Sequence, residues 1–183
     1  MNRPQVVAVV GLSGVGKSTA LEAAHASLAF EHLQASALIK AERERWRQAK
    51  IDHDALREAN INDNQALLVG GFRHTAPKAG LVILDGHTVI DTPDGLVEIE
   101  PKVFRMLGVS RFVVLTEEPE EIYRRRSADP GRKRPMRSVD ELRQQQERSI
   151  LVAHRAALDL RVPLVVLVCQ GVQDFVEALQ REP

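Results

Sequence analysis

Residues 6–19 read VVAVVGLSGVGKST and contain the strongest motif of the chain. The apolar, β-branched first half of this stretch is typical of a strand buried on both faces, and its second half fits the pattern G-x-x-x-x-G-K-[ST]. The glycines let successive backbone N–H groups point at phosphate oxygens, and the start of the next helix adds partial positive charge. Lys17 supplies a cation for the β- and γ-phosphates, and the Ser18 hydroxyl is a ligand for Mg²⁺. We therefore predict a triphosphate-binding loop made of Gly11, Ser13, Gly14, Val15, Gly16, Lys17, Ser18 and Thr19.

Short apolar runs of the same kind recur along the chain. They lie at 81–85, 111–116 and 163–168, with a weaker candidate at 32–36. Strands that alternate with helices indicate right-handed βαβ units and a three-layer α/β fold. The helical patterns between the runs cover about 17–30, 37–50, 54–69, 100–107, 118–127, 138–160 and 172–181.

Length and composition favour one domain over residues 1–183. A chain of 183 residues, 44% hydrophobic, can bury one sizeable core, and no linker or repeat divides it. The 25 basic residues balance 25 acidic ones, which excludes a uniformly basic nucleic-acid binder. The late apolar run 162–169 is far shorter than the ~20 residues of a membrane span, so we predict a cytoplasmic protein without a membrane partner. The single cysteine rules out an intrachain disulfide.

Two charged segments interrupt the strand–helix alternation. The first is helical, from about 37 to 80, and the second is rich in arginine, at 124–137. Binding and catalytic groups of α/β folds concentrate in such connections. We expect one or both segments to contribute to a site.

An acidic residue closes the second clear apolar run. Asp85 ends the strand predicted at 81–85, which places a carboxylate at the carboxyl end of the sheet, near the phosphate loop if the two strands are neighbours. It could organise the Mg²⁺ shell or orient a nucleophile, and the alternative is that it caps the next turn. His87 follows, and it could contact a nucleotide or serve in packing.

The arginine segment reads RRRSADPGRKRPMR at 124–137, with six Arg and one Lys against one Asp. The turn at 129–131 splits the cluster, so the arginines flank a loop. Guanidinium groups on such a loop can close over transferring phosphates, neutralise charge and exclude water. A solvated helix end is the plain alternative. Binding of nucleic acid is disfavoured, because no aromatic residue alternates with the arginines.

Taken together, these features resemble a P-loop nucleoside monophosphate kinase, and most closely the archaeal-type adenylate kinases and adenylate-kinase-like proteins. The stretch LVILDGHTVIDTPDG at 81–95 resembles the family strand that ends in Asp-x-His before a Thr-Pro turn. The stretch IYRRRSADPGRKR at 122–134 resembles the family lid, in which an arginine, an aspartate four residues later and two more arginines recur. Here these four residues are Arg125, Asp129, Arg132 and Arg134.

The resemblance implies a P-loop NTPase fold with a five-stranded parallel sheet and helices on both faces. It also implies ATP with Mg²⁺ as phosphoryl donor, a lid that closes during transfer, and an acceptor site in the helical insertion. Ser18 and Asp85 would hold the metal shell. The transferring phosphoryl group would be stabilised by Lys17, Arg125, Arg132 and Arg134, and Asp85 would take part in catalysis by organising the metal or water shell.

The acceptor site has weaker support than the donor site. Its expected contacts are Ser36, Lys40, Arg57, Gln65 and His87, although the first four could equally be helix-surface residues. The segment 94–104 departs from the Gly/Pro-rich turn common in adenylate kinases and places Glu98 and Glu100 near the acceptor or in solvent.

Three functions follow from this pattern. The first is ATP-dependent phosphoryl transfer to a nucleoside monophosphate, which needs positioning and charge neutralisation more than covalent chemistry. The second is a kinase for a nucleoside or another small molecule, which the acidic segment at 98–100 favours mildly. The third is an ATPase or nucleotide switch that acts on a macromolecular partner. The sequence leaves the oligomeric state open.

Overall fold

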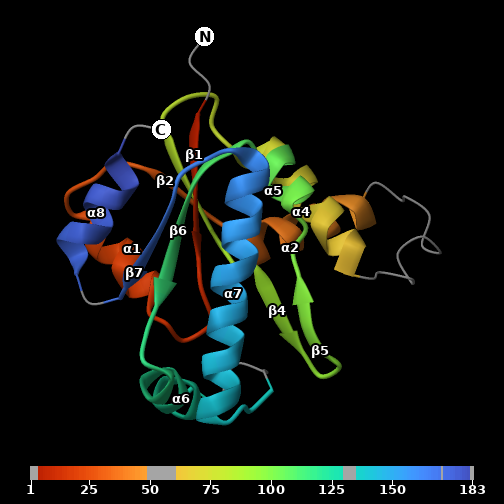
Figure 1. Cartoon of the computed structure of the whole chain (residues 1–183). Helices are drawn as coiled ribbons and strands as arrows, with labels where there is room; N and C mark the ends of the chain where they lie inside the picture. The colour runs from red at the N-terminus through yellow and green to blue at the C-terminus, as the bar shows by residue number, and fades with distance from the viewer. Residues whose placement is uncertain (1–3, 49–60, 130–134, 170, 182–183) are drawn as a thin grey trace.

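The computed structural model describes residues 4–48, 61–129, 135–169 and 171–181. Its centre is a five-stranded sheet in the order β2-β3-β1-β6-β7, in which every neighbouring pair is parallel (Figure 1). The predicted three-layer α/β fold with a five-stranded parallel sheet is therefore confirmed. The strands are β1 (Gln5–Val10), β2 (Glu31–Gln34), β3 (Leu81–Gly86), β6 (Val109–Thr116) and β7 (Leu164–Val168).

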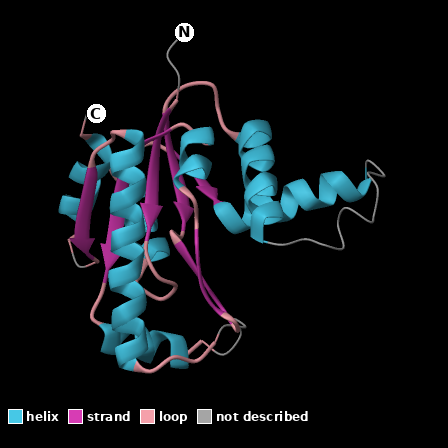
Figure 2. Ribbon diagram, turned by 45° about the vertical axis from the view of Figure 1, so that its right-hand side comes forward, coloured by secondary structure: helices cyan, strands magenta, loops and turns pink. Residues whose placement is uncertain are grey.

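Helices cover both faces of the sheet (Figure 2). One face packs against α2 (Ala35–Gln48), α4 (Ile61–Thr75), α5 (Pro101–Met106) and the later turns of α7 (Val139–Leu160). The other face packs against α1 (Lys17–His25) and α8 (Val172–Gln180). The short helix α6 (Pro119–Ser127) lies beyond the carboxyl ends of the strands, next to the first turns of α7 (Figure 1).

The central strand β1 shows why its sequence is apolar at every position. Val6, Ala8 and Val10 belong to the core on the α5 and α7 side. Val7 and Val9 belong to the core on the α1 and α8 side. Because alternate side chains enter opposite cores, neither face of this strand tolerates a polar residue.

The structure corrects two details of the predicted elements. The weak strand predicted at 32–36 spans Glu31–Gln34, and Ala35 already begins α2, so Ser36 lies on a helix. The sequence analysis missed an antiparallel hairpin, β4 (Val89–Thr92) with β5 (Gly95–Glu98). Its strands have only four residues each, too few for alternation of side chains to be distinctive. The first part of the helix predicted at 54–69 lies outside the described residues.

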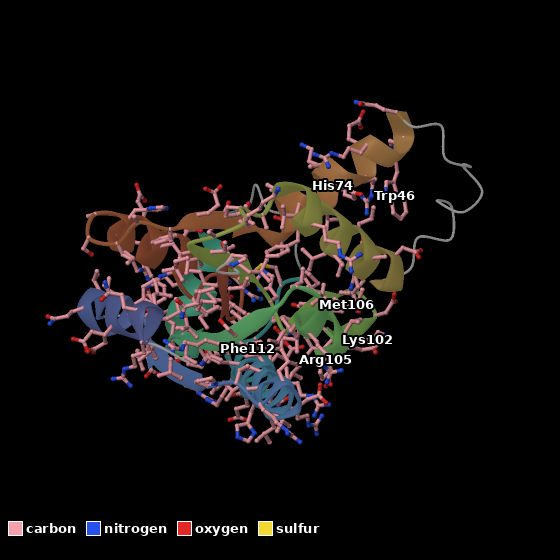
Figure 3. The ribbon with its side chains drawn as sticks, turned by 90° about the horizontal axis from the view of Figure 1, so that it is seen from above. Trp46, His74, Lys102, Arg105, Met106 and Phe112 are labelled. Carbon is pink, nitrogen blue, oxygen red and sulfur yellow. The ribbon has the colours of Figure 1, made fainter. Side chains whose placement is uncertain are left out.

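A buried carboxylate ties α2 to α4. Glu42 on α2 is 4% exposed; its Oε1 accepts a hydrogen bond from Trp46 Nε1 at 3.1 Å, and its Oε2 lies 2.9 Å from His74 Nδ1. Gly70 allows this approach, because an added Cβ there would lie 2.8 Å from Glu42 Oε1. Trp46 and His74 therefore lie together on the part of this helical pair that extends from the sheet (Figure 3).

Candidate active site

Several parallel strands deliver chemically useful residues to one edge of the sheet. Gly11 follows β1, Asp85 lies near the end of β3, Glu117 follows β6 and Cys169 follows β7. The carboxyl ends of parallel strands meet at the same edge, which is where α/β folds bind their ligands. The candidate site is built on this edge.

The phosphate loop joins β1 to α1 as the motif predicts. Val15 is fully buried beneath the loop, whereas Ser18 and Thr19 are exposed on the first turn of α1. Lys17 is 8% exposed, and its Nζ donates hydrogen bonds to the carbonyl oxygens of Gly11 at 3.0 Å and Leu12 at 3.1 Å. The ammonium group therefore lies across the start of the loop, where phosphate oxygens would meet it.

Asp85 lies beside the phosphate loop because β3 and β1 are direct neighbours. It pairs in register with Val9, two residues before Gly11. The carboxylate is buried at 5% exposure, and its Oδ2 lies 3.4 Å from His32 Nε2 on β2. The sequence predicted that Asp85 would lie near the phosphate loop if the two strands were neighbours. The structure shows that they are.

His87 connects the phosphate loop to the other half of the site. Its Nδ1 lies 2.7 Å from the carbonyl oxygen of Gly11. A carbonyl can only accept a hydrogen bond, so Nδ1 carries a proton in this contact. The ring also lines a cavity beside α2 and α4, described below. His87 therefore contacts both the phosphate loop and this cavity.

Two consecutive arginines of α6 reach back to the phosphate loop. Arg125 Nη1 donates to the carbonyl oxygen of Gly14 at 3.2 Å, and Arg126 Nε donates to that of Ser13 at 2.9 Å. Arg125 was singled out from the sequence, whereas Arg126 was not. No local signal separates the two, because both belong to the same run of three arginines. The predicted Arg132 and Arg134 lie outside the described residues.

Two acidic residues that the sequence analysis missed hold these arginines. Glu117 Oε2 accepts a hydrogen bond from Arg125 Nη2 at 2.9 Å, and Asp91 Oδ2 lies 3.8 Å from Arg126 Nη1. Asp91 also binds Arg137, with 3.0 Å between Oδ1 and Nη2. The position of Glu117 directly after an apolar strand, like that of Asp85 at a strand end, was a signal that could have found it.

A cavity of about 290 Å³ opens beside the phosphate loop on the α1 and α8 side. Gly16, Thr19, Arg125 and Cys169 line it, together with apolar residues of α1 and α8. Burial raises the pKa of the Cys169 thiol, and the Glu117 charge raises that pKa further, while Arg125 and Lys17 act in the opposite direction. The cavity combines apolar walls with a phosphate-binding loop, which suits the base and ribose of a nucleotide.

A second cavity, of about 180 Å³, lies on the opposite side of the strand ends. It is lined mainly by apolar residues of α2, α4 and the strands, and Ser36, Gln65 and His87 contribute polar groups to it. The amide oxygen of Gln65, a residue 7% exposed, is buried and has no hydrogen-bond partner among the residues that the structure describes. Three of the five predicted acceptor contacts therefore converge on one cavity.

The other two predicted acceptor contacts are Lys40 and Arg57. Lys40 is exposed on α2 and is not among the lining residues, and Arg57 lies outside the described residues. The acidic residues of the segment after the hairpin turn are engaged elsewhere: Glu98 forms ion pairs with Arg148 and Arg155 of α7, and Glu100 pairs with Lys102.

The fold and the phosphate loop are those of a P-loop protein, and the sequence relatives make it a P-loop kinase, an enzyme of the phosphotransferase class. The AAA_17 family, described as an AAA domain, matches residues 10–143, and the chain belongs to that family. The adenylate kinase of Thermoplasma acidophilum is 30% identical over 150 residues, which cover 76% of this chain and 75% of that protein. The adenylate kinase of Methanoculleus marisnigri is 27% identical over 187 aligned residues, which cover 95% of this chain and 97% of that protein. The resemblance seen in the motifs is confirmed.

Solved kinase structures share the fold. A gluconokinase from Sinorhizobium meliloti 1021 superposes with a TM-score of 0.53 and 21% identity, covering 98% of this chain and 91% of that one. A shikimate kinase from Bacteroides thetaiotaomicron gives a TM-score of 0.51 and 16% identity, covering 96% of each chain. At these identities the likeness shows the fold and not the acceptor. Within the described ranges, no helix is long and apolar enough to cross a membrane.

Proposed function

We propose that this kinase transfers the γ-phosphoryl group of ATP·Mg²⁺ to a nucleoside monophosphate. The observation that carries the proposal is the position of His87. Its ring lines the second cavity and contacts Gly11 at the start of the phosphate loop, and Gly16 at the other end of the loop lines the first cavity, so the phosphate loop links the two cavities. An in-line transfer needs its donor and acceptor sites to adjoin in this way. The curated relatives named adenylate kinase favour a nucleotide as acceptor.

On the donor side, the chain's groups bind and orient the triphosphate. The loop amides and Lys17 would hold the β- and γ-phosphates, and Arg125 would add positive charge where charge develops during transfer. The base would occupy the cavity of about 290 Å³. None of these groups forms a covalent bond with the phosphoryl group, so catalysis would rest on positioning and electrostatics.

The donor set beside the loop fits Mg²⁺. Ser18 offers a hydroxyl oxygen and Asp85 a carboxylate oxygen, the hard ligands that this ion prefers, with phosphate oxygens and water to complete the shell. When bound, the ion would neutralise charge on the β- and γ-phosphates. Asp85 is held at the sheet edge by its buried position, so it would orient the metal shell without a large rearrangement.

On the acceptor side, we infer that the apolar walls of the second cavity hold the base. Ser36 and Gln65 would supply hydrogen bonds to its polar edge, and His87 would lie toward the transferring group. The buried, unpartnered oxygen of Gln65 supports this inference, because such an atom gains free energy from any donor that a ligand brings.

The test is ADP formation from ATP·Mg²⁺ with a panel of ribo- and deoxynucleoside monophosphates, nucleosides and no acceptor. We expect turnover with one or a few monophosphates, and a loss of about 10²- to 10³-fold in Lys17→Ala, the size seen when one transition-state donor is removed. Lys78→Ala, an exposed lysine before β3, is the matched control and should keep wild-type turnover. Near wild-type turnover in Lys17→Ala would refute the role given to the loop.

A nucleoside or another uncharged hydroxyl compound is the second candidate acceptor. The observation that favours it is the lining of the second cavity, where the described residues include no lysine or arginine to meet a phosphate. In the same assay, turnover with nucleosides alone would establish this candidate. Slow hydrolysis that ignores every acceptor would instead favour a nucleotide switch.

A further inference from the structure

Glu117 is held in place by its own backbone and by α7. Its N–H donates to Gln146 Oε1 at 3.1 Å, and its carbonyl oxygen accepts from Gln146 Nε2 at 2.9 Å, so one amide side chain clamps both sides of the residue. Its side chain is fixed as well, because Oε1 accepts a hydrogen bond from the Glu118 N–H at 3.1 Å. The remaining oxygen, Oε2, is the one that meets Arg125.

The guanidinium of Arg125 uses each of its three nitrogens differently. Nη2 donates to Glu117 at 2.9 Å, Nε donates to Glu121 Oε1 at 2.7 Å, and Nη1 donates to the carbonyl oxygen of Gly14. Nη1 also lies 3.2 Å from the position that a Cβ on Gly16 would occupy. Two carboxylates therefore define the plane of the guanidinium, and its third nitrogen is directed at the phosphate loop.

The two carboxylates differ in burial. The side chain of Glu117 is 3% exposed, whereas the side chain of Glu121 is 28% exposed and that of Arg125 is 36% exposed. Glu121 also pairs with Arg124 on the surface of α6. A buried carboxylate that loses its partner is strongly destabilised, while a half-exposed one is solvated by water. Glu117 is therefore the fixed anchor of the pair, and Arg125 is the group that it holds.

We propose that Glu117 is a positioning residue that fixes the guanidinium of Arg125 over the phosphate loop in the orientation that binds the nucleotide phosphates. The inference rests on the proposed function in one respect, because it takes the 290 Å³ cavity and the loop as the ATP site. It adds a residue that acts through Arg125 and need not touch the nucleotide.

An alternative is that Glu117 competes with phosphate for Arg125, so that its removal tightens nucleotide binding. The geometry argues against it: Glu117 contacts Nη2, whereas the loop carbonyl of Gly14 contacts Nη1, so the carboxylate leaves the loop-facing nitrogen available for exchange with a phosphate oxygen. The two roles predict effects of opposite sign, which makes them separable by experiment.

The first test is a double-mutant cycle of Glu117 with Arg125. We expect Glu117→Ala to lower kcat/KM for ATP by about 10- to 100-fold, the cost of a misplaced catalytic group. In an Arg125→Ala background the same change should alter kcat/KM by less than about twofold, because the residue acts only through Arg125. An equal loss in both backgrounds, no loss in either, or tighter ATP binding would overturn the proposal.

Glu117→Gln keeps the experiment informative if the alanine variant fails to fold. It keeps the size of the side chain and one amide oxygen, which can accept from the Glu118 N–H or from Arg125 Nη2 but not from both, and it removes the charge, so we expect an intermediate loss of about tenfold. Glu120→Gln on α6 is the matched control, since Glu120 is exposed and contacts Arg143, and it should keep wild-type kinetics. A loss in Glu120→Gln as large as that in Glu117→Gln would contradict a specific role for Glu117.

Cys169 provides a readout that does not depend on turnover. It is the single cysteine of the chain and lines the cavity with Gly16 and Arg125, so bound ATP should slow its alkylation by iodoacetamide. We expect the ATP concentration for half-protection to rise about tenfold in Glu117→Gln but not in Glu120→Gln. If the wild type phosphorylates no acceptor, the proposed function fails while this assay still tests Glu117. Absence of any ATP protection, or equal protection of both variants, would overturn the positioning role.

Discussion

Gly11 lies where β1 passes into the phosphate loop, and a side chain there has no space. Its φ is +154°, and an added Cβ would lie 2.3 Å from the backbone oxygen of Leu115 on the neighbouring strand. A side chain at this position would push β1 and β6 apart at the edge where the nucleotide binds. The glycine at this position in the motif thus serves strand packing as well as the approach of phosphate.

Gly11→Ala should therefore lower the free energy of unfolding by about 2–4 kcal/mol, combining backbone strain with overlap of a backbone atom. Gly80→Ala is the matched control: its φ is +92°, but an added Cβ meets nothing within 4 Å. That variant should lose only about 1 kcal/mol, from the left-handed backbone alone. Urea denaturation of both variants measures the difference, and equal losses would contradict the packing argument.

The helix α7 organises the site from a distance through its first turns. Ser138 and Glu141 form a reciprocal cap: Ser138 Oγ accepts from the Glu141 N–H at 3.2 Å, and Glu141 Oε2 accepts from the Ser138 N–H at 2.7 Å. Arg137, directly before this cap, binds Asp91 of the hairpin, and Gln146, two turns into the helix, clamps Glu117. A well-defined start of α7 therefore fixes residues on both sides of the phosphate loop.

Ser138→Ala should lower the free energy of unfolding by about 1 kcal/mol at neutral pH, the usual cost of removing a helix N-cap. The Ser138 backbone N–H, with its hydroxyl, lowers the pKa of Glu141 below the ordinary value of 4.5. The charged carboxylate therefore stabilises the fold above pH 4.5, and this contribution is lost as the pH falls through the lowered pKa. The Ser138 hydroxyl also donates to Glu141 Oε2 at 3.0 Å, and this contact to the charged carboxylate is lost in Ser138→Ala. The difference between wild type and Ser138→Ala in urea denaturation should therefore shrink in part below pH 4.5, and a constant difference would contradict a contribution of the hydroxyl–carboxylate contact.

At the scale of the whole molecule, one sheet separates two cores and presents two cavities at its carboxyl edge. One core lies under α2, α4, α5 and α7, and the other lies under α1 and α8. The cavity of about 290 Å³ borders the core under α1 and α8, and the cavity of about 180 Å³ borders the core under α2, α4, α5 and α7. A nucleotide bound at the edge contacts groups that only the folded sheet brings together, so binding and folding are linked.

ATP·Mg²⁺ at about 100 times its Kd should therefore stabilise the folded protein by about 2.7 kcal/mol and raise Tm accordingly. Lys17→Ala should show a much smaller rise at the same ATP concentration, whereas Lys78→Ala should behave as wild type. Thermal unfolding followed by circular dichroism measures the shifts. An equal rise in Tm for wild type and Lys17→Ala would show that ATP stabilises the protein at some other place.

The features that could be predicted from the amino-acid sequence are local. The apolar runs at 6–10, 81–85, 111–116 and 163–168 predicted four of the five strands of the sheet, and the glycine-lysine pattern predicted the loop between the first strand and α1. These features depend on the backbone preferences of neighbouring residues and on continuous apolar runs, both of which can be recognised within a few consecutive residues. The hairpin at 89–98 was missed because four-residue strands contain too little alternation to be recognised.

Contacts between distant parts of the chain could not be predicted in this way and depend on the folded structure. The strand order places β3 against β1, and with it Asp85 beside the loop. Arg125 meets Gly14 across 111 positions, and His87 meets Gly11 across 76. Such contacts depend on which strands are neighbours in the sheet. The free energy of burying apolar surface, summed over the whole sheet and its two cores, fixes that strand order. For the same reason, the sequence could not show which of the neighbouring glutamates at 117–121 would contact Arg125.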